Sequence, residues 1–185
     1  MAQLFVGKES LVSDVYPIKT DQQFVNTLED NICCHGAMDK LISDGAKAET
    51  SKRVHDILQQ LCIEDWQSEP GYQHQNNAER RWGVIKAQVN SLLRRTRAPA
   101  NTWFLALQYV CYILNWIATP SLNWRTPLEV LDGETPDISP ILQYCFWDAV
   151  YYLVGDSQHV AFPLSPPEKK GHFVGFSENV GHTMT

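Results

Sequence analysis

The stretches LISDGAKAE (41–49) and SEPGYQHQNNAERRW (68–82) decide what this chain is expected to be. In the first stretch, an apolar run ends at Asp44, and Gly45 follows it. In the second, a polar loop rich in turn-forming residues leads into a basic helix that carries Glu79 in its first turn. Because hard divalent ions prefer oxygen ligands, these two carboxylates are the candidate catalytic and metal-binding pair.

Such a pair favours metal-dependent chemistry on a phosphodiester backbone, with DNA as the partner. Two divalent ions roughly 3.5 to 4 Å apart activate the attacking oxygen and neutralise the leaving oxygen. The sequence therefore predicts Mg²⁺, or Mn²⁺ in its place, as the cofactor. The spacing by itself is a weak signal, because 21 acids in 185 residues form many pairs at any separation. The adjoining Asp-Gly step and Gln/Asn-rich loop strengthen it.

The helix that begins near Asn77 and runs to about Arg97 has one face suited to a phosphate backbone. At 100° per residue, Lys86, Asn90 and Arg97 lie within about 40° of Glu79. The loop before the helix adds two polar amide side chains. The candidate nucleic-acid contacts are therefore Lys86, Asn90, Arg97, Gln75 and Asn76.

The other side chains of this helix are expected to pack or to face solvent. An adjoining apolar face recurs at helical spacing and should be buried, and its members are Trp82, Ile85, Val89, Leu92 and Leu93. Four arginines point away from the Glu79 face. We expect these at the solvated surface, and they are Arg80, Arg81, Arg94 and Arg95.

The net charge of -6 argues against a general nucleic-acid binder, because phosphate neutralisation supplies most sequence-independent affinity. Basic residues are nevertheless concentrated between positions 79 and 97, where six of them accompany a single acid. No apolar run reaches the roughly 18 residues of a membrane span, and no signal-peptide pattern opens the chain. We therefore expect an intracellular, soluble protein with no membrane partner and no small-molecule substrate.

The five cysteines are odd in number and lie mostly in apolar stretches, so we expect reduced thiols rather than disulfides. The adjacent Cys33, Cys34 and His35 lack the separated pairs that wrap a tetrahedral zinc ion. We interpret them as a helix end that is followed by a turn at Gly36.

Hydrophobic patterning predicts a main domain of residues 1–140 and a small β-rich module of residues 141–185. The expected strands of the main domain are 2–7 and 11–18, which form a hairpin, and then 38–43 and 62–68. The expected helices are 21–32, 48–61, 77–97, 102–117 and 127–132. The module should hold strands at 149–154, 158–162 and 172–177. Its aromatic residues are expected to fill a small core rather than to line a DNA path.

The two quoted stretches resemble the integrase core of Ty1/copia-type retrotransposons. LISDGAKAE looks like the family's strand with its Asp-Asn-Gly variant, and SEPGYQHQNNAERRW looks like its loop and Glu-Arg helix. Downstream, RTPLEVLDGETPDIS (125–139) and GHFVGFSENVGHT (171–183) resemble the family's next two segments. The resemblance covers nearly the whole chain, in order.

This resemblance implies an α/β fold with a ribonuclease H-like mixed sheet and flanking helices, followed by the small β-rich module. It also implies an Asp, Asp, Glu triad that uses Mg²⁺ to cut and join DNA ends. By position, Asp44 is the second carboxylate and Glu79 the third. A homo-oligomer in the complete integrase and action in the nucleus are further implications of the family.

The chain departs from the family pattern in two ways. The family's first carboxylate lies on a strand that would precede residues 2–7, so we expect an N-terminally truncated core that lacks this strand. Asp14 and Asp21 are the acids available upstream, and neither occupies the expected strand position. In addition, the loop between Asp44 and Glu79 is one residue shorter than is usual in the family.

Three functions remain open at this point. The chain is the core of a retrotransposon polyprotein that integrates DNA when it is joined to its upstream part. Alternatively, it is a non-catalytic nucleic-acid-binding remnant of a decayed element. In the third alternative, it is a protein-interaction or scarcely folded fragment.

Overall fold

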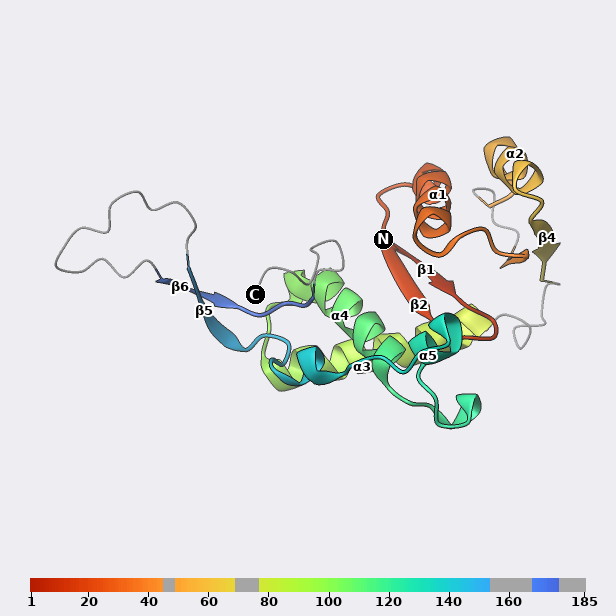
Figure 1. Ribbon diagram of the computed structural model, residues 1–185. Helices are drawn as coiled ribbons and strands as arrows, with labels where there is room; N and C mark the ends of the chain where they lie inside the picture. The colour runs from red at the N-terminus through yellow and green to blue at the C-terminus, as the bar shows by residue number, and fades with distance from the viewer. Residues whose placement is uncertain (45–48, 69–76, 154–167, 177–185) are drawn as a thin grey trace.

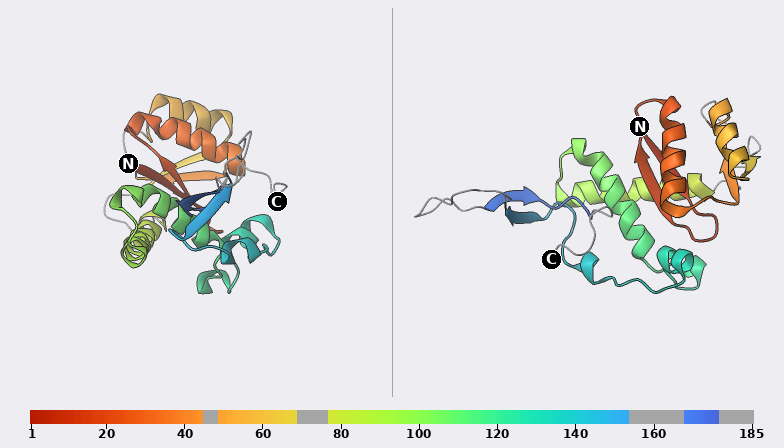
Figure 2. Two further views of the ribbon diagram at one scale, coloured as in Figure 1. Left: turned by 90° about the vertical axis from the view of Figure 1, so that its left-hand side faces the viewer. Right: turned by 45° about the horizontal axis from the view of Figure 1, so that its top comes forward.

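The computed structural model describes residues 1–44, 49–68, 77–153 and 168–176. The architecture is α/β, with a layer of short strands between helices (Figure 1 and Figure 2). Within these residues, no helix has the length and apolar character that crossing a bilayer requires.

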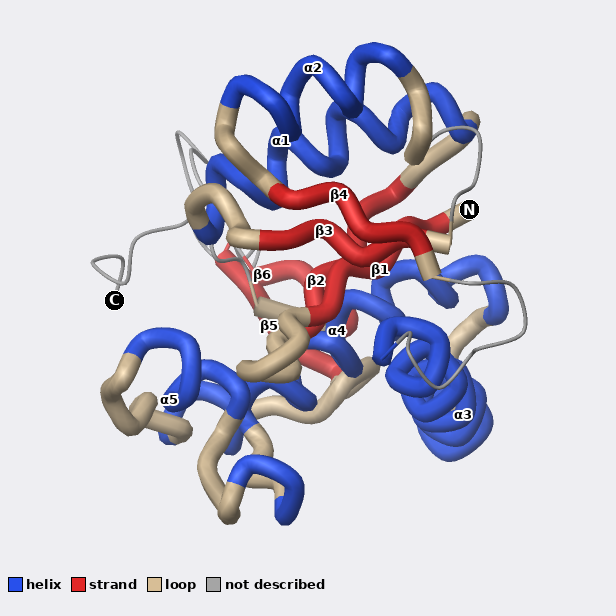
Figure 3. The backbone as a smooth tube through the Cα atoms, turned by 90° about the vertical axis from the view of Figure 1, so that its right-hand side faces the viewer, coloured by secondary structure: helices blue, strands red, loops and turns tan. Residues whose placement is uncertain are grey.

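Two helices lie on each side of the strands. α1 (Phe24–His35) and α2 (Lys52–Gln60) cover one side, while α3 (Asn77–Thr96) and α4 (Trp103–Trp116) cover the other (Figure 3). The buried residues Leu28, Val54, Ile85 and Val110 lie on the apolar helix faces that the spacing predicts, which explains the layering, although Leu61 after the end of α2 and Trp103 at the start of α4 are 43% and 42% exposed. Single 3₁₀ turns are found at Asp21–Gln23, Ala100–Thr102, Pro120–Leu122 and Ser139–Leu142.

The expected hairpin is present. β1 (Ala2–Val6) and β2 (Ser13–Pro17) are antiparallel, with Phe5 opposite Asp14. After the hairpin, α1 continues to His35 and stops at Gly36, whose φ of 84° few other residues adopt. The helix end expected around the adjacent cysteines is therefore confirmed.

The next pair of strands is parallel. β3 (Lys40–Ser43) and β4 (Glu64–Gln67) are joined through α2, and Asp44 follows the last residue of β3 as expected. Ser51 caps α2, because its side chain accepts a hydrogen bond from the backbone N–H of Val54. The described strands thus form separate pairs, and no ladder joins β1 to β3 to complete one mixed sheet.

Two buried clusters hold the layers together. The first packs α1 and α2 onto β3 and contains Phe24, Leu28, Leu41, Val54, Leu58 and Ile63. The second lies around α3 and α4 and contains Ile85, Val89, Ala106, Leu107, Val110, Cys111, Leu114 and Phe146. Phe146 is only 1% exposed, so residues beyond position 140 contribute to the core of the main domain.

The C-terminal part begins with α5 (Pro127–Asp132). Thr126 and Glu129 form a capping box at its start, and Gly133 ends it in the left-handed conformation. A ribbon of β5 (Ala149–Leu153) and β6 (Glu168–His172) then projects away from the helices (Figure 1).

The strand expected at 172–177 is wrong in position, because β6 ends at His172. Beyond it, Phe173 and Phe176 pack onto aromatic side chains of the main body, and the ring centroids of Phe176 and Tyr112 lie 4.9 Å apart. Packing against α4 therefore overrides the strand pattern of this segment. The strand expected at 158–162 lies outside the described residues.

The aromatic residues of the expected module behave in two ways. Phe173 and Phe176 fill space against α4. Tyr151 and Tyr152, on the ribbon, are 70% and 51% exposed. The aromatic side chains in the described part of the module therefore do not form a core of their own. The division near residue 140 remains a proposal.

A buried polar contact ties the hairpin to the helical layer. The backbone N–H of Ser13 donates to Oδ1 of Asn115 at 2.8 Å, and Nδ2 of Asn115 donates to the carbonyl of Ser13 at 3.1 Å. Nε of Arg81 donates to the Ser13 hydroxyl at 3.1 Å. The expectation that Arg81 belongs to the solvated surface is wrong, because it is half-buried and reaches under β2.

We expect Asn115→Ala to lower the free energy of unfolding by about 2 to 4 kcal/mol, because it leaves a buried N–H and a buried carbonyl of Ser13 without partners. Urea denaturation measures this. The matched control is Gln108→Ala, which removes an exposed amide from the same helix. Equal midpoints for the two variants would contradict this account of the contact.

We also expect four of the five thiols to react quickly with a disulfide reagent in the native protein. Cys33, Cys34, Cys62 and Cys145 are exposed, whereas burial raises the pKa of the Cys111 thiol to about 12. The measurement is the absorbance of released thionitrobenzoate, before and after unfolding. Cys111→Ala should leave the fast count at four, and Cys145→Ala should lower it by one. A fast count of five in the unchanged protein would contradict the packing of α4.

Candidate metal and nucleic-acid site

A cavity of about 680 Å³ lies between the hairpin, β3, α1 and the start of α3. Both Asp44 and Glu79 line it, although 34 residues separate them in the sequence. The two carboxylates that the sequence singles out therefore line the same cavity.

Each carboxylate owes its place to a different element. Asp44 is exposed and follows the end of the parallel strand β3, where the chain leaves the layer. Glu79 is exposed in the first turn of α3, where the positive end of the helix dipole favours a negative charge. Asn77 opens the same turn and also lines the cavity.

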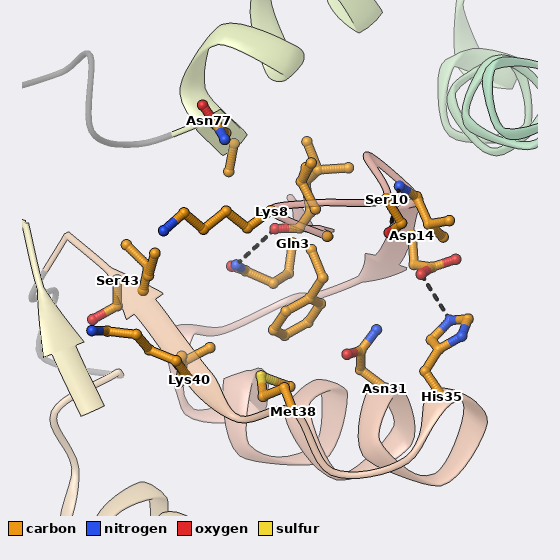
Figure 4. A pocket seen from close by; sticks show the side chains of 18 of the residues that line it. Gln3, Lys8, Ser10, Asp14, Asn31, His35, Met38, Lys40, Ser43 and Asn77 are labelled. Carbon is orange, nitrogen blue, oxygen red and sulfur yellow. Dashed lines mark hydrogen bonds and ion pairs between the residues drawn. The ribbon is translucent and has the colours of Figure 1, made fainter. Parts of the chain in front are cut away.

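Other polar side chains line the same cavity (Figure 4). Lys8, Lys40, Ser43 and Asn77 lie toward one side of it, away from Asp14 and His35. The ammonium of Lys40 is held 2.9 Å from a carboxylate oxygen of Glu64 and lies over the Trp66 ring. Neither lysine was expected at the cavity from its sequence context, because a hairpin-turn residue and a strand residue reach it only through packing.

The opposite end of the cavity carries Asp14, Asn31 and His35 (Figure 4). Nε2 of His35 lies 2.9 Å from a carboxylate oxygen of Asp14. Burial raises the pKa of Asp14 above its ordinary value, and His35 offsets part of this rise. The carboxylate of Asp14 therefore pairs with His35 rather than with the site of Asp44.

No third acid completes the pair in the part of the chain that the structure describes, where no group of three or more His, Cys, Asp or Glu side chains is suited to a metal ion. Asp21 begins a 3₁₀ turn, and its side chain is outside the described part. The donors present nonetheless fit a hard ion. Mg²⁺ is commonly held by one or two carboxylates together with waters and substrate phosphates, and Asp44 and Glu79 supply that number.

The outer face of α3 extends from this cavity. The ammonium of Lys86 lies 4.9 Å from the ring centroid of Trp82, which itself lines the cavity. At 1.5 Å per residue, Lys86 and Asn90 lie about 10 and 16 Å from Glu79 along the helix, and Arg97 about 27 Å. All three are exposed, and Arg97 follows the end of α3 with a φ of 55°. The remaining two candidates, Gln75 and Asn76, lie outside the described residues.

No family model matches the chain, and no curated protein matches it in sequence. Solved structures do match. The HTLV-2 integrase catalytic core domain in complex with magnesium, in its trimeric form, has a TM-score of 0.58 and 16% identity over 70% of this chain and 83% of that chain. Its dimeric form has a TM-score of 0.54 and 15% identity over 72% and 84%.

A chain of the simian T-cell lymphotropic virus intasome in complex with PP2A regulatory subunit B56 gamma also matches. Its TM-score is 0.61 with 16% identity, over 92% of this chain and 60% of that chain. At such low identity the similarity shows the fold alone. The expected ribonuclease H-like α/β fold of an integrase catalytic core is confirmed, and these structural neighbours are retroviral rather than of the Ty1/copia type.

Proposed function

We propose that this integrase-like core binds DNA along α3 and holds Mg²⁺, or Mn²⁺, between Asp44 and Glu79 for DNA strand transfer. The observation that carries the proposal is that both carboxylates line one cavity in this fold. The sequence resemblance to Ty1/copia-type integrases supports the finer assignment. A polyprotein origin, homo-oligomeric assembly and action in the nucleus belong to the same proposal.

The roles of the residues follow from their positions. In this proposal, Asp44 at the end of β3 and Glu79 at the start of α3 supply the oxygen ligands, and both line the cavity. The ion, when bound, supplies the activation of the attacking oxygen and the neutralisation of the leaving oxygen. Lys86 and Asn90, farther along the same face of α3, contact phosphates and orient the duplex toward the carboxylates.

A second candidate function is DNA binding without catalysis. It is favoured by one observation, that no third acid joins Asp44 and Glu79 within the described part of the chain. Two carboxylates bind Mg²⁺ weakly and position only part of the reaction. DNA binding that is indifferent to Glu79→Gln, without metal-dependent nicking, distinguishes this function from the first.

We expect Asp44→Asn and Glu79→Gln each to weaken metal binding by about tenfold or more, because each removes a charged ligand of the ion. Mn²⁺ serves as the probe, and the readout is the paramagnetic broadening of backbone amide signals near Ser43 and Ala78. Asp56→Asn and Glu134→Gln are matched controls, because both are exposed acids outside the cavity. Unchanged broadening in either site variant would remove that residue from the metal site.

In a longer chain that carries the upstream strand, the same two substitutions should abolish strand transfer and leave DNA affinity nearly unchanged. Retained transfer in either variant would overturn the catalytic role. Full DNA binding with no transfer in the unsubstituted longer chain would instead support the second candidate.

We expect Lys86→Ala to weaken DNA binding for all sequences and to reduce the dependence of log K on log salt by about one unit, since one phosphate contact is lost. Fluorescence anisotropy at several salt concentrations measures this slope. Lys52→Ala, at an exposed position on α2, is the matched control. An unchanged slope would show that Lys86 makes no phosphate contact and only packs on the Trp82 ring.

A further inference from the structure

A serine or threonine stands directly before proline at several places between residues 119 and 140. These steps are Thr119-Pro120, Thr126-Pro127, Thr135-Pro136 and Ser139-Pro140. A hydroxyl that precedes proline is the substrate of proline-directed protein kinases, which phosphorylate it in an accessible, extended segment. Whether each hydroxyl is accessible depends on the structure around it. A further step, Ser165-Pro166, lies outside the described residues.

Three of these hydroxyls lie in ordered local structure. Thr126 is 8% exposed, and its hydroxyl caps α5. Thr119 is half-buried, and its backbone forms an isolated bridge with Arg125. Ser139 is exposed but starts a 3₁₀ turn, and its backbone N–H donates to the carboxylate of Asp137. Each of these segments must unfold before a kinase can bind it in extended form.

The surroundings of Thr135 are different. It is exposed and lies outside every described helix and strand. Gly133 ends α5 with a φ of 80°, and Pro136 favours an extended backbone at the residue before it. α5 itself lies beside α4 at the periphery of the molecule (Figure 3). A kinase can therefore reach the Thr135 hydroxyl while the protein remains folded.

The Thr135 hydroxyl contacts a carboxylate that helps to hold α5. It donates to Oε1 of Glu129 at 3.3 Å. The same oxygen lies 3.4 Å from Nε of Arg125, and Nη2 of Arg125 donates to the Glu129 carbonyl at 2.9 Å. The other carboxylate oxygen, Oε2, accepts from the backbone N–H of Thr126 and completes the capping box. The Glu129 carboxylate thus joins Thr135, Arg125 and the start of the helix.

We propose that Thr135 is a phosphorylation site for a proline-directed protein kinase, with ATP as the phosphoryl donor. Oγ1 of Thr135 attacks the γ-phosphorus of ATP. An O–P bond forms as the bond between that phosphorus and the oxygen of the leaving ADP breaks, and the hydroxyl proton passes to the catalytic carboxylate of the kinase. The products are phosphothreonine at position 135 and ADP.

The phosphate changes the contacts of Glu129. It places about 1.5 to 2 negative charges where a neutral hydroxyl donated to the carboxylate, so this hydrogen bond is lost and the two anions repel each other. Arg125 already contacts the same carboxylate, and a guanidinium forms strong bidentate hydrogen bonds with phosphate. Arg125 therefore shifts from the carboxylate to the phosphate, and Glu129 loses two of the contacts that position it in the capping box.

The modification acts on an element that also borders the candidate site. Leu131 of α5 lines the cavity that Asp44 and Glu79 line. Phosphorylation of Thr135 therefore alters the helix that supplies this part of the cavity wall. The proposal does not rest on the metal and DNA chemistry proposed above, because the exposure of Thr135 and its contacts with Glu129 carry it.

The first test incubates the whole chain with a mitogen-activated protein kinase and Mg·ATP, and peptide mass spectrometry locates the phosphate. We expect phosphate at Thr135 and none at Thr119, Thr126 or Ser139. Pro136→Ala should abolish it, and Ser139→Ala is the matched control that should leave it unchanged. Phosphate at Ser139 in preference to Thr135, or an unchanged rate in Pro136→Ala, would overturn the proposal.

The rate of phosphorylation shows whether the folded protein is the substrate. A synthetic peptide of residues 131–140 provides the comparison. We expect the initial rate at Thr135 in the whole chain to equal that of the peptide within about tenfold. If only the unfolded chain reacted, the rate would fall with the unfolded fraction, by about a thousandfold or more. A fall of that size would overturn the proposal.

Phosphorus NMR of the phosphorylated chain tests the role of Arg125. A cation beside the phosphate stabilises the dianion and lowers its second pKa, which is ordinarily about 6. We expect this pKa to be higher in Arg125→Gln than in the unsubstituted chain. Arg53→Gln, at an exposed position on α2, is the matched control and should leave it unchanged. Equal pKa values in Arg125→Gln and the unsubstituted chain would overturn the proposed shift of Arg125.

Discussion

The arrangement of this molecule depends on the pair of hydrogen bonds between Ser13 and Asn115. They cross from the hairpin to α4, over 102 residues of sequence, and are buried. Because the amide of Asn115 satisfies both backbone groups of Ser13, β2 is held in one register against the helical layer. β1 follows β2 through its ladder, and β1 is one wall of the cavity. The position of the candidate site therefore rests on a contact outside it.

Arg81 extends the same contact toward α3. Its Nε donates to the Ser13 hydroxyl, while Nη2 of the same side chain is buried without a hydrogen-bond partner among the described residues. Burial lowers the pKa of this guanidinium below its ordinary value. Arg81 thus couples the helix that bears Glu79 to the hairpin, two positions away from the carboxylate. A residue that looks like surface charge in the sequence instead helps to set the orientation of α3.

The cavity has two chemically different aspects. Carboxylates, lysines and an asparagine are among its lining residues, and such groups are suited to an ion and a phosphate backbone. The other lining residues include those of β1 and β3 and apolar side chains such as Phe24 and Leu41.

The sequence alone predicted most of the local elements and singled out the candidate carboxylate pair. Alternation predicted the hairpin, helical spacing predicted α3 with its buried face, and Asp44 and Glu79 stood out because of their flanking residues. These patterns lie within short stretches of sequence, so they can be recognised without knowing which distant residues pack against them. Three features could not be predicted from the sequence: Arg81 is half-buried, Phe173 and Phe176 leave the strand pattern to pack on α4, and β1 and β3 line one cavity. Each of these depends on contacts between residues far apart in the chain, which hydrophobic periodicity does not encode.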